Sequence, residues 1–252
     1  MCMKQLLNKL LPNFLIKILV KAKYKKQNIG IHQENIKNNQ TVNIRCANKQ
    51  KYILLKNILF NSFSGILRIE KQGFYFHPIA VIAVPDVMDK YLKDIGAKSR
   101  NMNKKAEKNA ISYKVFDWNE KLDEIYEINT SSFNRQGREM DESYRAYPQT
   151  IEYPLEKEYS IVHMGTFVED KLVGYVELYI YGNFAMINRI LGHKEYLRFG
   201  VMNLMIKACV EYAMKNSIEY INYLTMQNRK NNSLSAFKKR VGFREYSLME
   251  LK

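Results

Sequence analysis

The stretch between residues 174 and 179 places one carboxylate between two aromatic side chains. If this stretch forms a strand, Glu177 shares a face with Tyr175 and Tyr179, whereas Val176 and Leu178 occupy the opposite face. Aromatic neighbours withdraw a carboxylate from water and raise its pKa, which suits a group that accepts a proton. We therefore interpret Glu177 as a candidate general base; a solvent-facing strand glutamate is the alternative.

Further polar residues follow in the next part of the sequence. Asn188 and Arg189 interrupt the apolar run from residue 185 to residue 191, and we expect them to face a bound donor or acceptor. His193 follows that run and is a second candidate base, since an imidazole changes its charge near neutral pH. A histidine without a catalytic role is the alternative interpretation.

Two arginines flank a glycine in the polar stretch from residue 131 to residue 141. Arg135 and Arg138 lie on either side of Gly137, which predicts a loop. Guanidinium groups bind carboxylates and phosphates through paired hydrogen bonds, so the two arginines are candidate substrate-binding residues. The alternative is a pair of solvated side chains.

A sheet is needed to position these residues. The apolar runs on either side of Glu169, Asp170 and Lys171 predict a tight β-hairpin, and a turn at Gly182 and Asn183 leads to a third strand. A helix at 201–215, a strand at 218–226, a helix at 233–240 and a strand at 243–251 follow. This order predicts an α/β (α+β) fold with a mixed, mostly antiparallel sheet and flanking helices. In such sheets ligands bind where neighbouring strands part.

The composition is that of an ordinary globular protein apart from its charge. Of 252 residues, 40 are Lys or Arg and 25 are Asp or Glu, which gives a formal net charge of +15. This balance favours anionic partners such as a phosphorylated cofactor, nucleic acid or an anionic membrane surface, and does not choose among them. The three cysteines lack metal-ligand spacing, as do His32 and His77, so we expect no metal site. The cysteine usage also indicates a reducing, cytoplasmic compartment.

The first 24 residues combine apolar residues at helical spacing with five lysines that fall mostly outside that stripe. Such a basic amphipathic segment can lie on the inner face of an anionic membrane. A helix packed against the protein's own core is the alternative. No stretch is apolar and long enough to suggest a spanning helix.

We divide the chain into a basic amphipathic segment at 1–28, a β-leaning region at 29–98 and a main domain at 99–252. In the second region, short β-prone runs lie at 41–45, 51–59, 66–70, 74–77 and 79–84, and a helix is predicted at 86–95. A helix after Lys98 follows, with Ser99 as a candidate N-cap.

Two segments carry a resemblance to a known family. The basic helix around residues 100–108 resembles a segment of Fem-type and related acyltransferases, and the end of the chain resembles the last helix and strand of the GNAT acyltransferase superfamily. The residues that match are Arg100, Lys104, Lys105, Ala106 and Lys108 in the first segment, and Asn231, Leu234, Phe237, Lys238, Gly242 and Phe243 in the second. The resemblance extends over roughly residues 98–252.

The resemblance implies a site for an acyl donor between splayed strands and at the start of the following helix. It implies that Asn188, Arg189, Arg198, Gly200, Val201, Asn203, Asn231, Phe237 and Lys238 contact this cofactor. A helix N-terminus presents free N–H groups to phosphate, which supports the same placement. The chain departs from acetyl-CoA users, however, with Leu197 and Met202 at positions where the family has Gln or Arg and a small residue.

The remaining roles also follow from the resemblance. Several members of the family carry an acidic base on the strand of Glu177. Because alternation places Tyr175 and Tyr179 on the same face, we expect these two side chains to contact the substrate. Its leaving-group acid is a tyrosine in the last helix, where this chain has Lys238, so Tyr246 on the final strand is a candidate replacement.

We therefore expect an enzyme that transfers an acyl group from acetyl-CoA to an amino or hydroxyl group of a sugar or cell-envelope precursor. A Fem-like transferase that uses aminoacyl-tRNA is one alternative, supported by the net charge and the basic helix. A non-catalytic protein of the same fold, which binds an anionic surface or RNA, is the other.

Overall fold

The computed structural model describes residues 28–32, 41–45, 69–71, 74–135, 138–153, 159–226 and 232–251. The predicted amphipathic segment at 1–24, the β-prone run at 51–59 and the candidate residue Asn231 lie outside the described residues.

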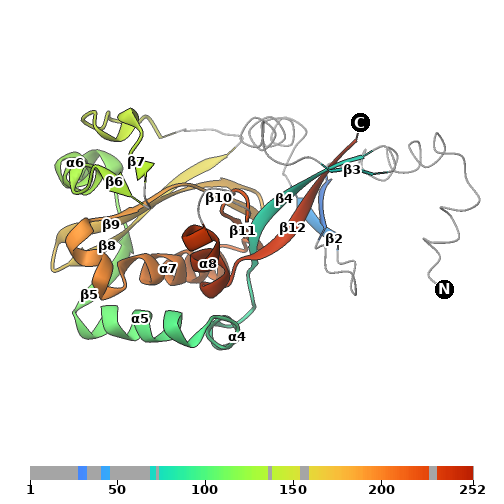
Figure 1. Cartoon of the computed structure of the whole chain (residues 1–252), viewed down its shortest axis with the longest axis horizontal. Coiled ribbons are helices and arrows are strands. Elements are labelled where there is room, and N and C mark those ends of the chain that lie inside the picture. Colours follow the sequence, from blue (N-terminus) through green and yellow to red (C-terminus); the bar gives the residue numbers. More distant parts are fainter. Residues whose placement is uncertain are drawn as a thin grey trace, which may run out of the picture.

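One mixed sheet organises the described residues (Figure 1). Its strands lie in the order β2-β1-β12-β4-β11-β10-β9-β8-β5, and β3 pairs with β4. Every neighbouring pair described in this sheet is antiparallel except β10 and β11, which are parallel. The strands are β1 Asn28–His32, β2 Thr41–Arg45, β3 Ile69–Lys71, β4 Phe74–Ala83, β5 Ile111–Val115, β8 Ser160–Val168, β9 Lys171–Tyr181, β10 Phe184–Gly192, β11 Tyr220–Asn222 and β12 Arg244–Leu251.

Helices cover both faces of this sheet, with α5, α7 and α8 on one face and α6 on the other (Figure 1). A two-stranded hairpin, β6 Asn134–Arg135 and β7 Arg138–Glu139, lies beside α6. The helices are α4 Met88–Asp94, α5 Ala97–Lys108, α6 Leu122–Thr130, α7 Val201–Lys215 and α8 Asn232–Arg240, with 3-10 turns η1 Trp118–Glu120, η2 Glu142–Tyr144 and η3 Lys194–Phe199.

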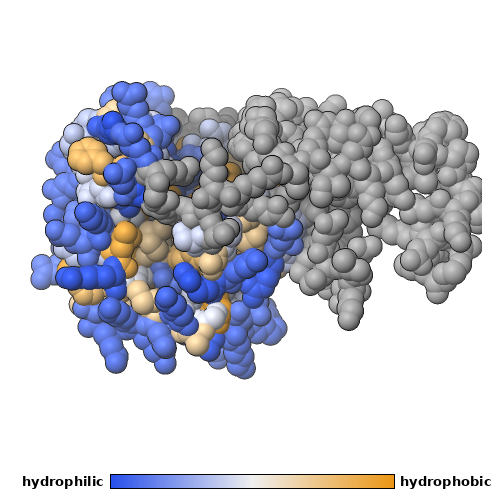
Figure 2. Space-filling model, in the orientation of Figure 1, coloured by the Kyte–Doolittle hydropathy of each residue, from blue (hydrophilic) through white to orange (hydrophobic). Residues whose placement is uncertain are grey.

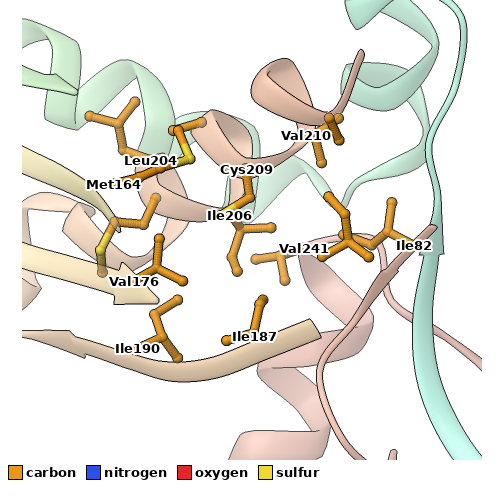
Figure 3. Packing of buried hydrophobic residues seen from close by; sticks show 14 of the residues in the cluster. Ile82, Met164, Val176, Ile187, Ile190, Leu204, Ile206, Cys209, Val210 and Val241 are labelled. Atoms are coloured by element: carbon orange, nitrogen blue, oxygen red, sulfur yellow. The ribbon is translucent and has the colours of Figure 1, made fainter. Parts of the chain in front are cut away.

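The main core lies between the sheet and the layer of α5, α7 and α8. Figure 3 shows side chains from several elements meeting here, among them Met164 on β8, Val176 on β9 and Leu204, Ile206 and Cys209 on α7. Cys209 is fully buried within this core. Burial of this apolar area is the main source of stability for the layer.

A second, aromatic core lies under α6 on the opposite face of the sheet. Trp118, Ile125, Phe167 and Tyr175 are among its buried members. Because Tyr175 belongs to this cluster and Val176 to the main core, the predicted alternation of β9 is confirmed.

The predicted mixed, mostly antiparallel sheet with flanking helices is confirmed, with some differences at the ends of elements. The predicted strand at 218–226 is paired only over Tyr220–Asn222. The predicted runs at 74–77 and 79–84 form one strand, β4, which lies between β11 and β12. The sheet therefore includes residues from both sides of the expected boundary at residues 98 and 99.

The basic helix α5 is confirmed, but its expected N-cap is wrong. Gly96 is the N-cap, and Ser99 lies inside the helix on its buried side. Arg100 donates hydrogen bonds to the carbonyl oxygens of Leu92 and Ile95, so it joins the end of α4 to α5. The lysines Lys104, Lys105 and Lys108 are exposed, and Figure 2 shows mainly hydrophilic side chains along the lower part of the described surface.

Candidate functional site

The two parallel strands of the sheet part near the middle of β10. Their last pair is Met186 with Asn222, where β11 ends, whereas β10 continues to Gly192. Beyond Met186, β11 therefore offers no partner to the backbone of β10. The structure has the splayed pair of strands at which ligands bind in sheets of this kind.

A bulge lies just beyond the point of parting. The register between β10 and β9 shifts between Ile187 and Arg189, so Asn188 is an extra residue in β10. Asn188 is exposed, and its side-chain amide donates a hydrogen bond to Oε1 of Glu177. The bulge thus brings an exposed amide and a buried carboxylate together at the parting strands.

Glu177 lies on β9 with its side chain 8% exposed. Burial by itself raises the pKa of this carboxyl, but hydrogen bonds from His163 and Asn188 and the positive charge of Arg189 outweigh burial. The net result is a pKa below the ordinary value. The expectation that aromatic neighbours raise this pKa is therefore wrong, because polar partners stabilise the ionised form.

A chain of hydrogen bonds behind Glu177 includes residues that the sequence did not single out. Nε2 of His163 lies 3.2 Å from Oε2 of Glu177, and Nδ1 of His163 lies 3.1 Å from the hydroxyl of Tyr153. The backbone N–H of Trp118 donates to that hydroxyl at 2.9 Å. The His163 side chain is fully buried, with the Trp118 ring 4.7 Å away between centroids.

The two tyrosines beside Glu177 have different environments. Tyr175 is buried, and its hydroxyl donates to Asn129 at 2.7 Å. Tyr179 is half-buried, and burial is the main cause that raises its pKa to about 12, with a smaller contribution from Glu177. Tyr179 therefore borders the carboxylate at its accessible side, whereas Tyr175 belongs to the aromatic core.

The side chains of Arg189 and Arg135 make different contacts. Arg189 pairs in register with Glu177 and lies with its guanidinium 5.6 Å from the centre of the Tyr144 ring. Arg135 donates to the carbonyl oxygens of Gly192 and Ile128, at 2.8 and 2.9 Å, so it joins the end of β10 to α6. Arg135 therefore has a structural contact, and its expected contact with substrate stays a prediction. The backbone of Arg138 lies in β7, and its role as a substrate-binding residue stays a prediction.

The other two candidate catalytic residues lie apart from Glu177. Nδ1 of His193 accepts from the N–H of Glu195 at 3.4 Å, so His193 caps the turn η3. Tyr246 is buried on β12, and β4, β11 and β10 separate β12 from β9. At a spacing of about 4.8 Å between strands, Tyr246 is roughly 19 Å from the strand of Glu177. The structure does not place Tyr246 in one site with Glu177.

The start of α7 has the position that the resemblance implies for a phosphate site, but its residues also have other contacts. Gly200 has a φ of 94°, and a Cβ added there would lie 2.2 Å from the carbonyl oxygen of Met102. Val201 is buried, and Asn203 is half-buried. The exposed Arg198 lies 4.7 Å from the centre of the Phe199 ring. The close approach of α5 is thus sufficient to require glycine at position 200.

Lys238 is buried on α8, at the position where the family resemblance places a tyrosine. Its ammonium donates to the carbonyl oxygens of Tyr223 and Thr225, at 2.7 and 2.8 Å. Burial lowers the pKa of this amine to about 8. Phe237 is partly buried and packs against the main core, so a contact with a cofactor stays a prediction. Lys238 therefore fixes the backbone of residues 223–225, which come directly after β11.

A cavity of about 650 Å³ lies elsewhere, where α8 ends and β12 begins. It is lined by Asp94, Gly96, Met226, Lys239, Arg240, Phe243, Arg244 and Glu245. None of the expected site residues lines it.

Comparison with known proteins places this arrangement in a family. Residues 122–243 match the acetyltransferase (GNAT) family. This part of the chain is a GNAT domain. The GNAT domain contains α6, the parted strands β10 and β11, Glu177 and α7, and family membership supports acyl transfer as its general activity.

Several solved structures are similar to this chain at low sequence identity, and FemX shares its fold. FemX aligns with a TM-score of 0.54 and 13% identity, over 92% of this chain and 76% of that chain. L-PGS from Bacillus licheniformis has a TM-score of 0.47 and 12% identity, over 80% of this chain and 73% of that chain. The PaiA N-acetyltransferase from Thermoplasma acidophilum, in complex with coenzyme A, has a TM-score of 0.42 and 16% identity, over 56% of this chain and 99% of that chain. No curated protein matches the sequence.

In the part of the chain that the structure describes, no helix is both long and apolar enough to cross a membrane.

Proposed function

We propose that the chain transfers an acyl group from acetyl-CoA to an amino or hydroxyl group of a sugar or cell-envelope precursor. The observation that carries this proposal is the parting of β10 and β11 beside the bulge at Asn188, whose amide contacts Glu177. In a GNAT domain this arrangement supports a donor between the strands and an acceptor beside the carboxylate.

The reaction requires one bond to form and one to break at the acyl carbon. The acceptor nitrogen or oxygen attacks the thioester carbonyl, the carbon–sulfur bond breaks, and the acceptor loses a proton while the thiolate gains one. Glu177 is ionised at neutral pH because of its lowered pKa, so it can stabilise the positive charge that develops on the acceptor and take its proton.

The donor thioester needs its own polar contacts. Backbone N–H groups of β10 beyond Met186 are available to the donor on the side where β11 has ended. Lys238 supports the backbone after β11 on the opposite side of the parting, and its pKa of about 8 makes it a proton donor near neutral pH. We assign Lys238 to the end of the donor that carries the leaving sulfur.

A second candidate function uses aminoacyl-tRNA as the donor. Three observations at the start of α7 favour it: Leu197 is exposed, Met202 stands where acetyl-CoA users have a small residue, and α5 approaches Gly200 closely. These features differ from a cradle for pyrophosphate. The exposed lysines of α5 lie beside this corner and suit a polyanion.

A direct binding experiment distinguishes the two donors. We expect acetyl-CoA, but not the same concentration of adenosine 3′,5′-bisphosphate, to raise the melting temperature of the full chain. A ligand at 100 times its Kd adds about 2.7 kcal/mol to the free energy of unfolding. If aminoacyl-tRNA stabilises the chain in moderate salt and acetyl-CoA does not, then aminoacyl-tRNA is the donor. No response to either ligand would favour a non-catalytic binding protein.

Turnover tests the role of the carboxylate. With a panel of amino sugars and acetyl-CoA, release of free thiol reports transfer directly. We expect Glu177→Gln to lower kcat about 100-fold or more, because an amide cannot accept the proton. Glu127→Gln is the matched control, since Glu127 is exposed on α6 and pairs with Lys171 away from the parted strands. Equal rates for Glu177→Gln and the wild type would remove Glu177 from the mechanism.

A further inference from the structure

The hydrogen-bond chain behind Glu177 continues away from the parted strands into the protein. It runs from Glu177 on β9 to His163 on β8 and then to Tyr153, whose hydroxyl receives the backbone N–H of Trp118. His163 pairs in register with Glu177, so the two side chains lie on adjacent strands. The Trp118 and Phe116 rings lie 4.7 and 6.0 Å from the imidazole and contribute to its burial.

The direction of these hydrogen bonds follows from the groups at each end. A carboxylate only accepts, so Nε2 of His163 must carry the proton that it shares with Glu177. Nδ1 of the neutral imidazole is then an acceptor, and it faces the Tyr153 hydroxyl at 3.1 Å. Because the Trp118 N–H already donates to that hydroxyl, the proton of Tyr153 is directed to an acceptor, and both Nδ1 and the Asp117 carboxylate are within its reach. With the Tyr153 proton directed to Nδ1, an imidazole that carries its proton at Nε2 has a partner at both ring nitrogens.

The same hydrogen bonds explain how the Glu177 carboxylate is held in place among apolar neighbours. Oε1 of Glu177 accepts from Asn188 and Oε2 from His163, and the Tyr179 hydroxyl also contacts this carboxylate. The Asn188 amide is on the exposed side and can exchange its partner for a substrate, whereas the buried His163 cannot. The imidazole is therefore the fixed contact that aims the carboxylate toward the parted strands.

We propose that His163 is a positioning residue, which keeps the Glu177 carboxylate ionised and directed toward the acceptor and is itself fixed by Tyr153. This inference rests on the proposed function, because it assigns a partner to the base of that reaction. His163 does not contact substrate in this arrangement. It acts on the reaction only through Glu177.

Other charged and titratable groups also face this pair, and a test must hold them constant. Arg189 on β10 contributes positive charge at Glu177, and Tyr179 on β9 and Tyr153 lie beside it. Asp117, which precedes Trp118, lies near the Tyr153 hydroxyl. Substitution of His163 alone leaves all of these groups unchanged.

The experiment is a titration of the Glu177 carboxyl carbon by NMR in the full chain, with Glu177→Gln to assign the signal. His163→Leu removes the donor to Oε2, and we expect the midpoint to rise by about one to two pH units. His163→Gln retains an N–H donor near the position of Nε2, and we expect its midpoint within about half a unit of the wild type. The nitrogen shifts of His163 in the wild type should show the Nε2-protonated form.

Two results would overturn the inference. One is an unchanged midpoint in His163→Leu, and the other is a wild-type imidazole protonated at Nδ1 alone. If His163→Leu does not fold, the imidazole tautomer and the midpoint of His163→Gln decide the question, and a rise of a full unit in His163→Gln would overturn it. With an active donor and acceptor, the acid limb of kcat/KM should move by the same amount as the NMR midpoint. A shifted midpoint without transfer from any donor would refute the proposed function and leave this placement intact.

Discussion

Substitution of Gly200 by alanine tests whether the packing of α5 or a bound ligand requires this glycine. Gly200 is the N-cap of α7 and has a φ of 94°, in the left-handed region. An added Cβ would lie 2.2 Å from the oxygen and 3.0 Å from the carbonyl carbon of Met102, both backbone atoms of α5. We expect the Gly200→Ala variant to be destabilised without any ligand present.

The magnitude has two parts. A non-glycine residue in the left-handed region costs about 1 to 2 kcal/mol, and a new overlap inside packed structure costs about 1 to 3 kcal/mol. The backbone of a helix cannot turn aside as a flexible side chain can, so both parts apply. The sum of about 2 to 5 kcal/mol corresponds to a loss of roughly 4 to 20 °C in melting temperature for a chain of this size.

Two other glycines supply matched controls for thermal and urea unfolding by circular dichroism. Gly96 has a φ of −63°, and the atom nearest to an added Cβ lies 3.9 Å away. Gly96→Ala should therefore leave the free energy of unfolding nearly unchanged. Gly242 has a φ of 104° but would meet only side-chain atoms, at 3.2 Å and beyond, so Gly242→Ala should fall between the two. Equal stability of the Gly200 and Gly96 variants would refute the reasoning.

Three further predictions concern buried charge, each measured by urea unfolding. Arg135→Met should lower the free energy of unfolding by about 2 to 4 kcal/mol, because buried carbonyl oxygens of Gly192 and Ile128 lose their donor; a raised KM with unchanged stability would instead indicate a substrate contact. The pKa of Lys238 is lowered to about 8 in the folded state, so the unfolded state binds more protons between about pH 8 and 10.5. The wild type should therefore gain stability relative to Lys238→Met as pH rises through this window, by roughly 3 kcal/mol in total, and a constant difference would contradict the assigned burial. The pKa of Glu177 is lowered, so its contribution is present above its unfolded pKa and is lost as pH falls through the folded pKa. The advantage of the wild type over Glu177→Gln should thus shrink between pH 7 and pH 3, and an advantage that grows on acidification would show the opposite shift.

Periodic patterns predicted the elements of the GNAT domain well. The predicted helix at 201–215 agrees with α7 at both ends, because its apolar residues recur at helical spacing and are buried against the sheet. The hairpin of β8 and β9 follows from its charged turn between two apolar runs. Glu177 could be chosen because β9 alternates, which is a local property of the sequence.

The partners of Glu177 could not be predicted, since bulges change the register. Val168 pairs with Lys171 next to the turn, and continued without a break this register would place His163 opposite Val176. A shift between Thr166 and Phe167 moves His163 opposite Glu177 instead. One extra residue thus decides whether the imidazole meets the carboxylate, and nothing in the local pattern marks it.

Long-range placement was a second source of error. Tyr246 was a candidate acid because it follows the last helix, yet β4 lies between its strand and β11. β4 comes from a part of the chain more than 130 residues before β11, and no local pattern tells where such a strand enters a sheet. Insertion of β4 moves β12 one strand further from the parted pair, which separates Tyr246 from the site.

The pKa of Glu177 is lowered and not raised as expected, because local sequence pattern and strand register act on it in opposite directions. The sequence correctly indicated aromatic neighbours, and burial among them does raise the pKa of the carboxyl. Hydrogen bonds from His163 and Asn188, together with nearby positive charge, reverse the result. Both hydrogen bonds depend on bulges, one at Asn188 and one that brings His163 into register. A buried carboxylate can therefore stay ionised in this GNAT domain because the strands on either side of it each depart from regular pairing by one residue. The extra residue between β8 and β9 is Val173, a buried member of the main core, whereas Asn188 is exposed. Deletion of Asn188 should therefore raise the pKa of Glu177 without removing a core side chain, and the NMR midpoint of the carboxyl carbon measures this rise.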